Sequence, residues 1–141
     1  MVIYTIGHSA RAKEQFLHLL KQHDIEAVID VRHFPTSTKH PHFKRECMQH
    51  WLTDMGIRYY WLGDTLGGYR NGGYEAYMQT EAFAHGIAEL EAIARECRAA
   101  IMCAERFPWK CHRRFIASYL QLRGWIVIHI IDEKRTWQPR D

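Results

Sequence analysis

The stretch AAIMCAERFPWKCHRRFIASYLQLR, residues 99–123, places an apolar run, a polar junction and a helical pattern in direct succession. The run 99–103 is typical of a buried strand, and Pro108 suits the first turn of a helix that ends at Arg123, before Gly124. Around the point where the run meets the helical pattern, residues 102–114 carry two thiols, a carboxylate, an imidazole and several guanidinium groups. Such groups are costly to desolvate beside a core unless they are paired. We therefore interpret this junction as the functional centre of the chain.

The alternation of strand and helix continues on both sides of this junction. Helical patterns separate short apolar runs, which predict four further strands at 2–6, 27–29, 58–62 and 125–131. This alternation predicts an α/β fold, in which a mostly parallel five-stranded sheet carries helices on both faces. We expect a single three-layer, Rossmann-like domain over residues 1–141. The polar tail 132–141 is expected to form an edge segment or a loose end.

The composition of the chain is typical of a globular protein without a membrane-spanning segment. With 141 residues, 47% hydrophobic and 25% charged, the chain suits one globular domain with a full core. No apolar stretch approaches the ~20 residues of a membrane span, and the first residues lack the features of a signal peptide. We therefore expect a cytoplasmic protein with no membrane association. In that compartment, four cysteines without a pairing pattern predict free thiols.

Polar residues follow the predicted strands at the point where each strand ends. His8 and Ser9 follow the first strand, Asp30 and Arg32 close the second, and Glu105 follows the strand 99–103. In open α/β sheets, ligands bind outside the carboxyl ends of the strands. We therefore expect these residues to form one site, over which the glycine-rich segment 63–74 would close as a mobile loop or lid.

Cys111 is a candidate nucleophile. If the helix starts at Pro108, Cys111 lies in its first turn, where free amides, the helix dipole and nearby basic residues lower a thiol pKa. His112 or His8 would then serve as its acid/base partner. The alternative is that Cys111 is a buried small residue that anchors the helix. Cys103, at the end of a buried strand, fits a core position better, although a strand end also suits a nucleophile.

The charged residues of the junction allow both a catalytic and a structural interpretation. Glu105 can act as an acid/base group if its pKa is raised, or it can form an ion pair with Arg32 or Arg113. Asp30 and Arg32 lie on one face by strand alternation and allow the same two interpretations. In either case these groups would surround the thiols.

Metal binding is an alternative role for the junction. Cys103, Cys111 and His112 are soft ligands, and His8 could be a fourth. Seven residues separate the two cysteines, and zinc sites usually show tighter pairing. Backbone amides around Cys103 could also cradle an anion as in phosphatase or sulfurtransferase loops, but the segment 106–108 is bulky and lacks one donor. We assign no metal ligand.

The segment 31–45 is the clearest basic patch, because it contains no acidic residue. Its cations are Arg32, Lys39, Lys44 and Arg45. With aromatic residues nearby, this patch could bind phosphates or single-stranded nucleic acid by charge and stacking. The alternative is a solvated surface loop.

An ordered set of short motifs resembles one known family. The motifs are Thr5–Ser9, Asp30–Arg32 with Pro35 and Ser37, Met102–Glu105, and Cys111–Arg113. The set closely resembles the domain-of-unknown-function family 488, over about residues 3–129. The resemblance implies a compact α/β domain found mainly in prokaryotes, and it implies no particular reaction. Members often have an acidic residue before the proline that corresponds to Pro108, where this chain has Phe107.

These observations lead to one functional hypothesis and two alternatives. The hypothesis is a small enzyme acting on an anionic substrate, for which a nucleotide is a candidate. Its nucleophile or redox thiols and proton-handling groups would be Cys111, Cys103, His8, Glu105 and His112. The substrate would be oriented by Ser9, Asp30, Arg32, Ser37 and Arg113. The alternatives are a nucleic-acid or nucleotide binding module without catalysis and a metal-binding protein; no cofactor is assigned.

Overall fold

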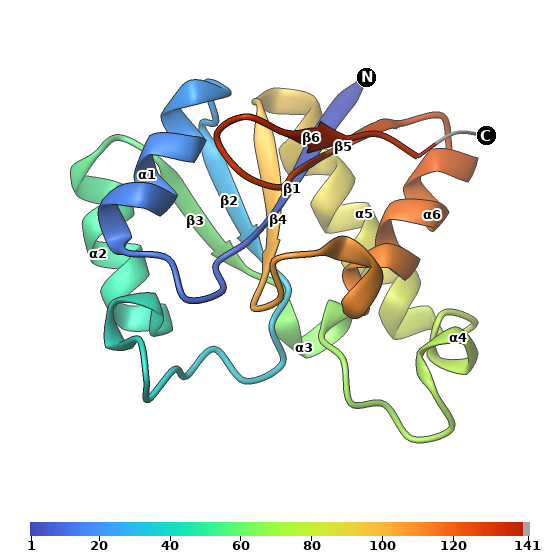
Figure 1. Cartoon of the computed structure of the whole chain (residues 1–141). Helices are drawn as coiled ribbons and strands as arrows, with labels where there is room; N and C mark the ends of the chain where they lie inside the picture. The colour runs from blue at the N-terminus through green and yellow to red at the C-terminus, as the bar shows by residue number, and fades with distance from the viewer. Residues whose placement is uncertain (140–141) are drawn as a thin grey trace.

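The computed structural model describes residues 1–139 and is built on one six-stranded sheet (Figure 1). The strands are β1 (Val2–Gly7), β2 (Ala27–Asp30), β3 (Arg58–Trp61), β4 (Ala99–Cys103), β5 (Ile126–Ile130) and β6 (Thr136–Trp137). Their order is β3-β2-β4-β1-β5-β6, and β1 to β5 are all parallel. The expected α/β class is confirmed. The sheet has one strand more than predicted, because β6 in the polar tail pairs antiparallel with β5.

Helices cover both faces of this sheet, as Figure 1 shows. The longer helices are α1 (Lys13–Gln22), α2 (Arg45–Asp54), α5 (Glu81–Glu96) and α6 (Arg113–Leu122). Short helical turns are η1 (Pro41–Phe43), α3 (Gly63–Leu66), α4 (Tyr74–Tyr77) and η2 (Pro108–Lys110). Across residues 1–139, no helix has the length and apolar character needed to span a membrane.

Strand alternation divides the core into two apolar clusters, one on each face of the sheet. Along β4, Ile101 and Cys103 pack into the cluster that contains the buried residues of α5 and α6. Ala100 and Met102 point the other way, into the cluster with α1 and α2. Burial of each large apolar side chain stabilises the fold by roughly 1.5–3 kcal/mol. The same alternation fixes Cys103 on the face from which α6 approaches.

The segment 63–74 differs from the mobile loop that its glycines suggested. Its first residues form α3, in which Leu66 is fully buried, and Gly68 is buried as well. A Cβ atom on Gly67 would lie 2.7 Å from the Cα of His33, so close packing requires glycine there. Residues 69–73 are mostly exposed, with Tyr69 at 85%, and Tyr74 packs back against the core.

Within the described part of the tail 132–141, Thr136 and Trp137 form the edge strand β6. Positions 140–141 lie outside the described residues.

Candidate active site

The carboxyl ends of β1, β2 and β4 meet at one edge of the sheet, because these strands are parallel neighbours. The backbone continues this pairing beyond the strands: His8 N–H donates to the Cys103 carbonyl at 2.9 Å, and Ser9 N–H donates to the Ala104 carbonyl at 2.8 Å. On the other side of β4, Val31 N–H donates to the Met102 carbonyl at 3.0 Å. The polar residues that follow these strands therefore lie at one edge.

A pocket of about 490 Å³ opens at this edge. Cys103, Cys111 and His112 contribute to its lining, together with the charged residues Arg32, Glu105 and Lys110. Ala104, next to Cys103, also lines the pocket. The remaining wall comes from the loops after β2 and α3 and consists of His33, Phe34, Thr36, Gly68 and Tyr69.

Cys111 lies just before α6, and not in the first turn of a continuous helix. The turn η2 ends at Lys110, and Cys111 has an extended backbone with φ −146° and ψ 162°. The helix then begins at Arg113, whose N–H donates to the Cys111 Sγ at 3.2 Å. The predicted continuous helix 108–123 is therefore wrong at its start. A helix amide nevertheless points at the sulfur, as the hypothesis of an activated thiol requires.

The two thiols of the junction are in contact and unequal. Cys103 Sγ and Cys111 Sγ are 2.8 Å apart, and both cysteines are free. Burial raises the pKa of the Cys103 thiol well above its usual range, so this thiol keeps its proton and donates it in a hydrogen bond to Cys111. That hydrogen bond is the main cause that lowers the pKa of Cys111 to about 4, and His112 adds to the effect.

His112 is held in an orientation that suits a partner for this thiolate. Its Nε2 lies 2.9 Å from the carbonyl of Val31, to which it donates. Its Nδ1 therefore faces the Cys111 Sγ, at 3.8 Å. The imidazole packs against Tyr74, with 5.3 Å between ring centroids, and a Cβ atom on Gly68 would lie 3.2 Å from Nδ1. Gly68 thus leaves room for the ring in this position.

Arg113 supports the junction through backbone carbonyls, and not through an ion pair with Glu105. Its guanidinium is fully buried and donates to the carbonyls of Glu105, at 3.2 Å, and Arg106, at 3.1 Å. Its Nε and Nη1 atoms have no hydrogen-bond partner among residues 1–139. The Glu105 residue is exposed, and within those residues its carboxylate forms no ion pair with Arg113 or Arg32. The expected ion pair of Glu105 is therefore wrong.

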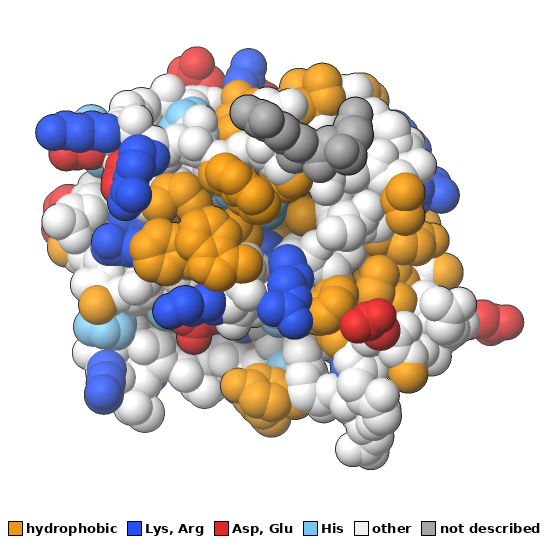
Figure 2. All heavy atoms as spheres, turned by 45° about the vertical axis from the view of Figure 1, so that its right-hand side comes forward, with side chains coloured by type: hydrophobic (Ala, Val, Ile, Leu, Met, Phe, Trp, Pro, Cys, Tyr) orange, Lys and Arg blue, Asp and Glu red, His pale blue; other side chains and the backbone are white. Residues whose placement is uncertain are grey.

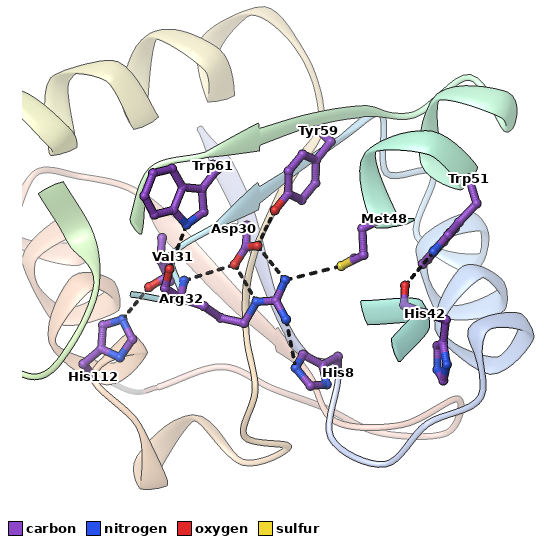
Figure 3. A network of polar contacts seen from close by, with 10 residues as sticks. All are labelled: His8, Asp30, Val31, Arg32, His42, Met48, Trp51, Tyr59, Trp61 and His112. Atoms are coloured by element: carbon purple, nitrogen blue, oxygen red, sulfur yellow. Dashed lines mark hydrogen bonds and ion pairs between the residues drawn. The ribbon is translucent and has the colours of Figure 1, made fainter. Parts of the chain in front are cut away.

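A second polar cluster surrounds Asp30, which is fully buried at the end of β2 (Figure 3). Arg32 donates from Nε to Asp30 Oδ1 at 2.9 Å and from Nη2 to Oδ2 at 2.7 Å, and its backbone N–H donates to Oδ1 at 3.0 Å. The Tyr59 hydroxyl, from β3, also donates to the carboxylate. The carboxylate therefore accepts four hydrogen bonds, two at each oxygen, and both oxygens are already occupied by protein donors rather than free to bind a substrate.

His8 belongs to this second cluster. Its Nδ1 donates to the Ser9 carbonyl at 2.9 Å, and its Nε2 accepts from Arg32 Nη1 at 3.3 Å. The ring stacks on Phe43 with 4.5 Å between centroids. Burial lowers the pKa of His8 to about 4, so the imidazole is neutral near pH 7. Figure 3 shows His8 and His112 on opposite sides of Arg32, which leaves His112 as the histidine beside the thiols.

The structure thus divides the predicted residues into three groups. Cys103, Cys111, His112 and Arg113 lie together, whereas His8, Asp30 and Arg32 form the second cluster, from which Arg32 also reaches the pocket. The side chains of Ser9 and Ser37 belong to neither cluster, although the Ser9 backbone carbonyl accepts from His8. Ser37 Oγ accepts the His40 N–H at 3.0 Å in a local turn.

Sequence reasoning did not assign the aromatic wall of the pocket to the site. Phe34 and Tyr69 are 64% and 85% exposed, and their ring centroids are 5.7 Å apart. They come from loops rich in proline, hydroxyl residues or glycine. Large aromatic side chains are unusual in such loops, and this is the signal that could have identified them.

A resident metal ion was the third interpretation of the junction. Across residues 1–139, no group of three or more His, Cys, Asp or Glu side chains is arranged to hold one. The two thiols and His112 therefore make contacts with one another and with the backbone.

The fold and this edge define a small three-layer α/β protein with a cysteine–histidine pair beside its sheet. The chain belongs to the family described as "Domain of unknown function DUF488", which matches residues 12–120. This match confirms the resemblance found in the sequence. It includes the motifs around Asp30, Cys103 and Cys111, whereas the motif at 5–9 lies before it. The comparisons with curated proteins and with solved structures found no match.

Proposed function

We propose that this protein is an enzyme that uses the Cys111 thiolate as a nucleophile on an anionic, nucleotide-like substrate. The observation that carries the proposal is the set of three groups around the Cys111 sulfur, at the wall of the pocket. The Cys103 thiol lies at 2.8 Å, the Arg113 N–H at 3.2 Å and the His112 Nδ1 at 3.8 Å. Each of them can donate a hydrogen bond or carry a positive charge, so each stabilises the thiolate over the thiol.

The proposed reaction begins from the Cys111 thiolate, with the proton that Cys111 has given up held on His112 Nδ1. The sulfur lone pair then forms a bond to the electrophilic atom of the substrate, and the leaving group departs with the electron pair of the broken bond. His112 gives its proton to that leaving group. A water molecule next attacks the covalent intermediate and passes a proton to His112, and the released thiolate completes the cycle. The Nε2 bond to the Val31 carbonyl holds the imidazole in place throughout.

The pocket lining supports the substrate class. Lys110 and Arg32 provide positive charge, although the charge of Arg32 is largely offset by Asp30. Phe34 and Tyr69 present exposed rings on which a planar group can stack. A compound with a planar ring and an anionic group, such as a nucleotide, combines both features. Cysteines kept as free thiols suit the reducing cytoplasm that we expect for this protein.

Protection from alkylation tests the substrate class. The protein is treated with iodoacetamide at limiting concentration, with and without each member of a panel of ribonucleotides, and modification of each cysteine is followed by peptide mass spectrometry. We expect at least one nucleotide to slow modification of Cys111 and to leave the exposed Cys47 unchanged, since Cys47 lies outside the pocket. Equal rates at Cys111 with every nucleotide would contradict the proposed substrate class.

A second candidate function is thiol redox chemistry, and the contact between Cys103 and Cys111 favours it. Cys111 would attack a substrate disulfide and displace one thiolate; Cys103 would then attack the Cys111 sulfur of the mixed disulfide, form an internal disulfide and release the second substrate sulfur, which takes the Cys103 proton. Cys103→Ser separates the two candidates. A serine hydroxyl can still donate to the thiolate, so nucleophilic turnover is retained, whereas release through an internal disulfide is lost.

A further inference from the structure

Three aromatic side chains form a second surface beside the thiol pocket, which we call the aromatic platform: Phe107, Trp109 and Trp137. Phe107 stacks on Trp109 with 5.0 Å between centroids and 19° between planes. Trp109 meets Trp137 edge to face, with centroids 5.6 Å apart. The two tryptophans are 47% and 45% exposed. In Figure 2, hydrophobic side chains gather at the surface near the end of the described chain, with Lys and Arg side chains beside them.

Regular structure holds this platform in place. Phe107 and Trp109 flank Pro108, which starts the turn η2, and the Lys110 N–H closes that turn on the Phe107 carbonyl at 3.1 Å. Trp137 lies in β6, where it pairs with His129 of β5 and stacks on its ring at 5.4 Å. The exposed rings are therefore fixed before any partner binds, which lowers the entropy cost of binding.

The charge beside the platform is positive. A hollow of about 550 Å³ is lined by the three aromatic residues and by Lys134, Arg135, Thr136 and Ile131, and among residues 1–139 no carboxylate lines it. Asp132 lies next to it and pairs with Arg135 at 2.8 Å, whereas Lys134 forms no ion pair with any of residues 1–139. Lys110, next to Trp109 in the chain, is a further exposed cation. The exposed aromatic rings of the platform therefore lie beside the positively charged side chains of Lys134 and Lys110.

We propose that the aromatic platform binds single-stranded nucleic acid. Bases would stack on Trp109 and Trp137, and phosphates would contact Lys134 and Lys110. A single strand fits better than a duplex, because paired bases present no free face to an aromatic ring. This surface is separate from the basic patch 31–45, in which Arg32 is bound to Asp30 and the Arg45 guanidinium lies over the Trp61 ring at 4.4 Å.

The platform and the thiol pocket share one segment of chain. Phe107 and Trp109 line the hollow beside the platform, and Lys110 lines the thiol pocket. A strand bound along the platform would thus pass close to the mouth of that pocket. The inference goes beyond the proposed thiol chemistry and does not depend on it, since binding alone is measured below.

Fluorescence anisotropy of a labelled oligothymidylate of about 12 nucleotides tests the inference, because known sites span about 4–16 nucleotides. We expect Trp137→Ala and Trp109→Ala each to weaken binding by about 5- to 150-fold, which corresponds to ~1–3 kcal/mol per stacked base. Trp137→Phe keeps a stacking face and should recover most of the affinity. Lys134→Ala should reduce the slope of log K against log salt by about 0.7.

Two controls make the result specific. Lys39→Ala combined with Arg45→Ala removes two cations from the basic patch and should leave the affinity within about twofold of wild type. Leu122→Ala removes an apolar side chain that is 88% exposed elsewhere and should have no effect. Thermal unfolding of each variant checks that the fold is kept. The inference is overturned by absence of binding at low salt, by equal affinity for a duplex of the same length, or by loss of binding in the Lys39/Arg45 variant but not in the tryptophan variants.

Discussion

The rate at which Cys111 is alkylated should be almost independent of pH across the neutral range. Only the thiolate reacts with iodoacetamide, and the hydrogen bond from Cys103, with help from His112, lowers the pKa of Cys111 to about 4. Above about pH 5.5 the thiol is therefore already ionised, and raising the pH adds no further thiolate. An unstructured cysteine peptide, with a pKa of about 8.5, should instead react about tenfold faster for each pH unit up to about pH 8.

Two opposing effects set the ratio of the alkylation rate of Cys111 to that of the reference peptide. At about pH 5, Cys111 is about 90% thiolate and the peptide about 0.03%, a ratio near 3,000 in favour of Cys111. A thiolate of lower pKa is also a weaker nucleophile, and with a Brønsted coefficient of about 0.45 this reduces its intrinsic rate about 100-fold. We therefore expect Cys111 to react about 30-fold faster at about pH 5 and about 75-fold slower at about pH 9, where the peptide is mostly ionised.

The assay follows loss of each unmodified cysteine peptide by mass spectrometry after timed alkylation between about pH 4 and 9. Restricted access to the pocket lowers the rate by the same factor at every pH, so the shape of the profile is diagnostic. His112→Gln removes the imidazole and should move the midpoint of the Cys111 profile to higher pH. The reasoning is refuted if Cys111 in the wild-type protein reacts ever faster up to about pH 8, as the reference peptide does.

Three further predictions concern oxidation and stability. Hydrogen peroxide should oxidise Cys111 to a sulfenic acid, which Cys103 then attacks with loss of water, so the intact mass falls by two hydrogens. Cys103→Ser should instead retain the added oxygen. An unchanged mass in the wild type would argue against the contact between the two sulfurs. Asp30→Asn should lower the free energy of unfolding by about 3–5 kcal/mol in urea titrations, because it leaves Arg32 buried without its counter-charge; a loss below about 1 kcal/mol would contradict this. Burial lowers the pKa of His129 to about 3, so the unfolded state binds more protons in mild acid. Stability should therefore fall by about 1.6 kcal/mol between about pH 6.5 and 5 through this residue, and His129→Asn should flatten that dependence.

The hydrophobic pattern of the sequence was sufficient to predict most of the strands and helices, since the buried parallel strands are nearly continuous apolar runs. The strand 99–103 has the bounds that its apolar residues predict. Edge strand β6 could not be predicted in this way, because Thr136 and Trp137 are exposed and belong to a polar tail. Its position depends on pairing with β5, which is a tertiary contact and leaves no local periodicity.

The location of the site in the fold could be predicted from the sequence, but the hydrogen-bond and ion-pair partners of its side chains could not. Parallel strand ends meet at one edge whatever side chains they carry, so the meeting of His8, Asp30 and Cys103 follows from topology. The choice of partners depends on side-chain directions that spacing does not determine. An ion pair with Arg32 or Arg113 was one of the two interpretations of Glu105, but the Arg113 guanidinium binds the Glu105 backbone carbonyl and the Glu105 side chain is exposed.

The fully buried Arg113 connects the chemistry of the thiols with the stability of the junction. A guanidinium without a carboxylate partner is costly to bury, and carbonyl groups offset only part of its charge. The positive charge of Arg113 lowers the pKa of Cys103 against the larger effect of burial, and the Arg113 amide binds the Cys111 sulfur. A negative charge on the thiol pair is therefore the natural counterpart of this cation. The same residue fixes the turn at 105–106 through two carbonyls, so the thiolate and the wall of the pocket are positioned by one side chain.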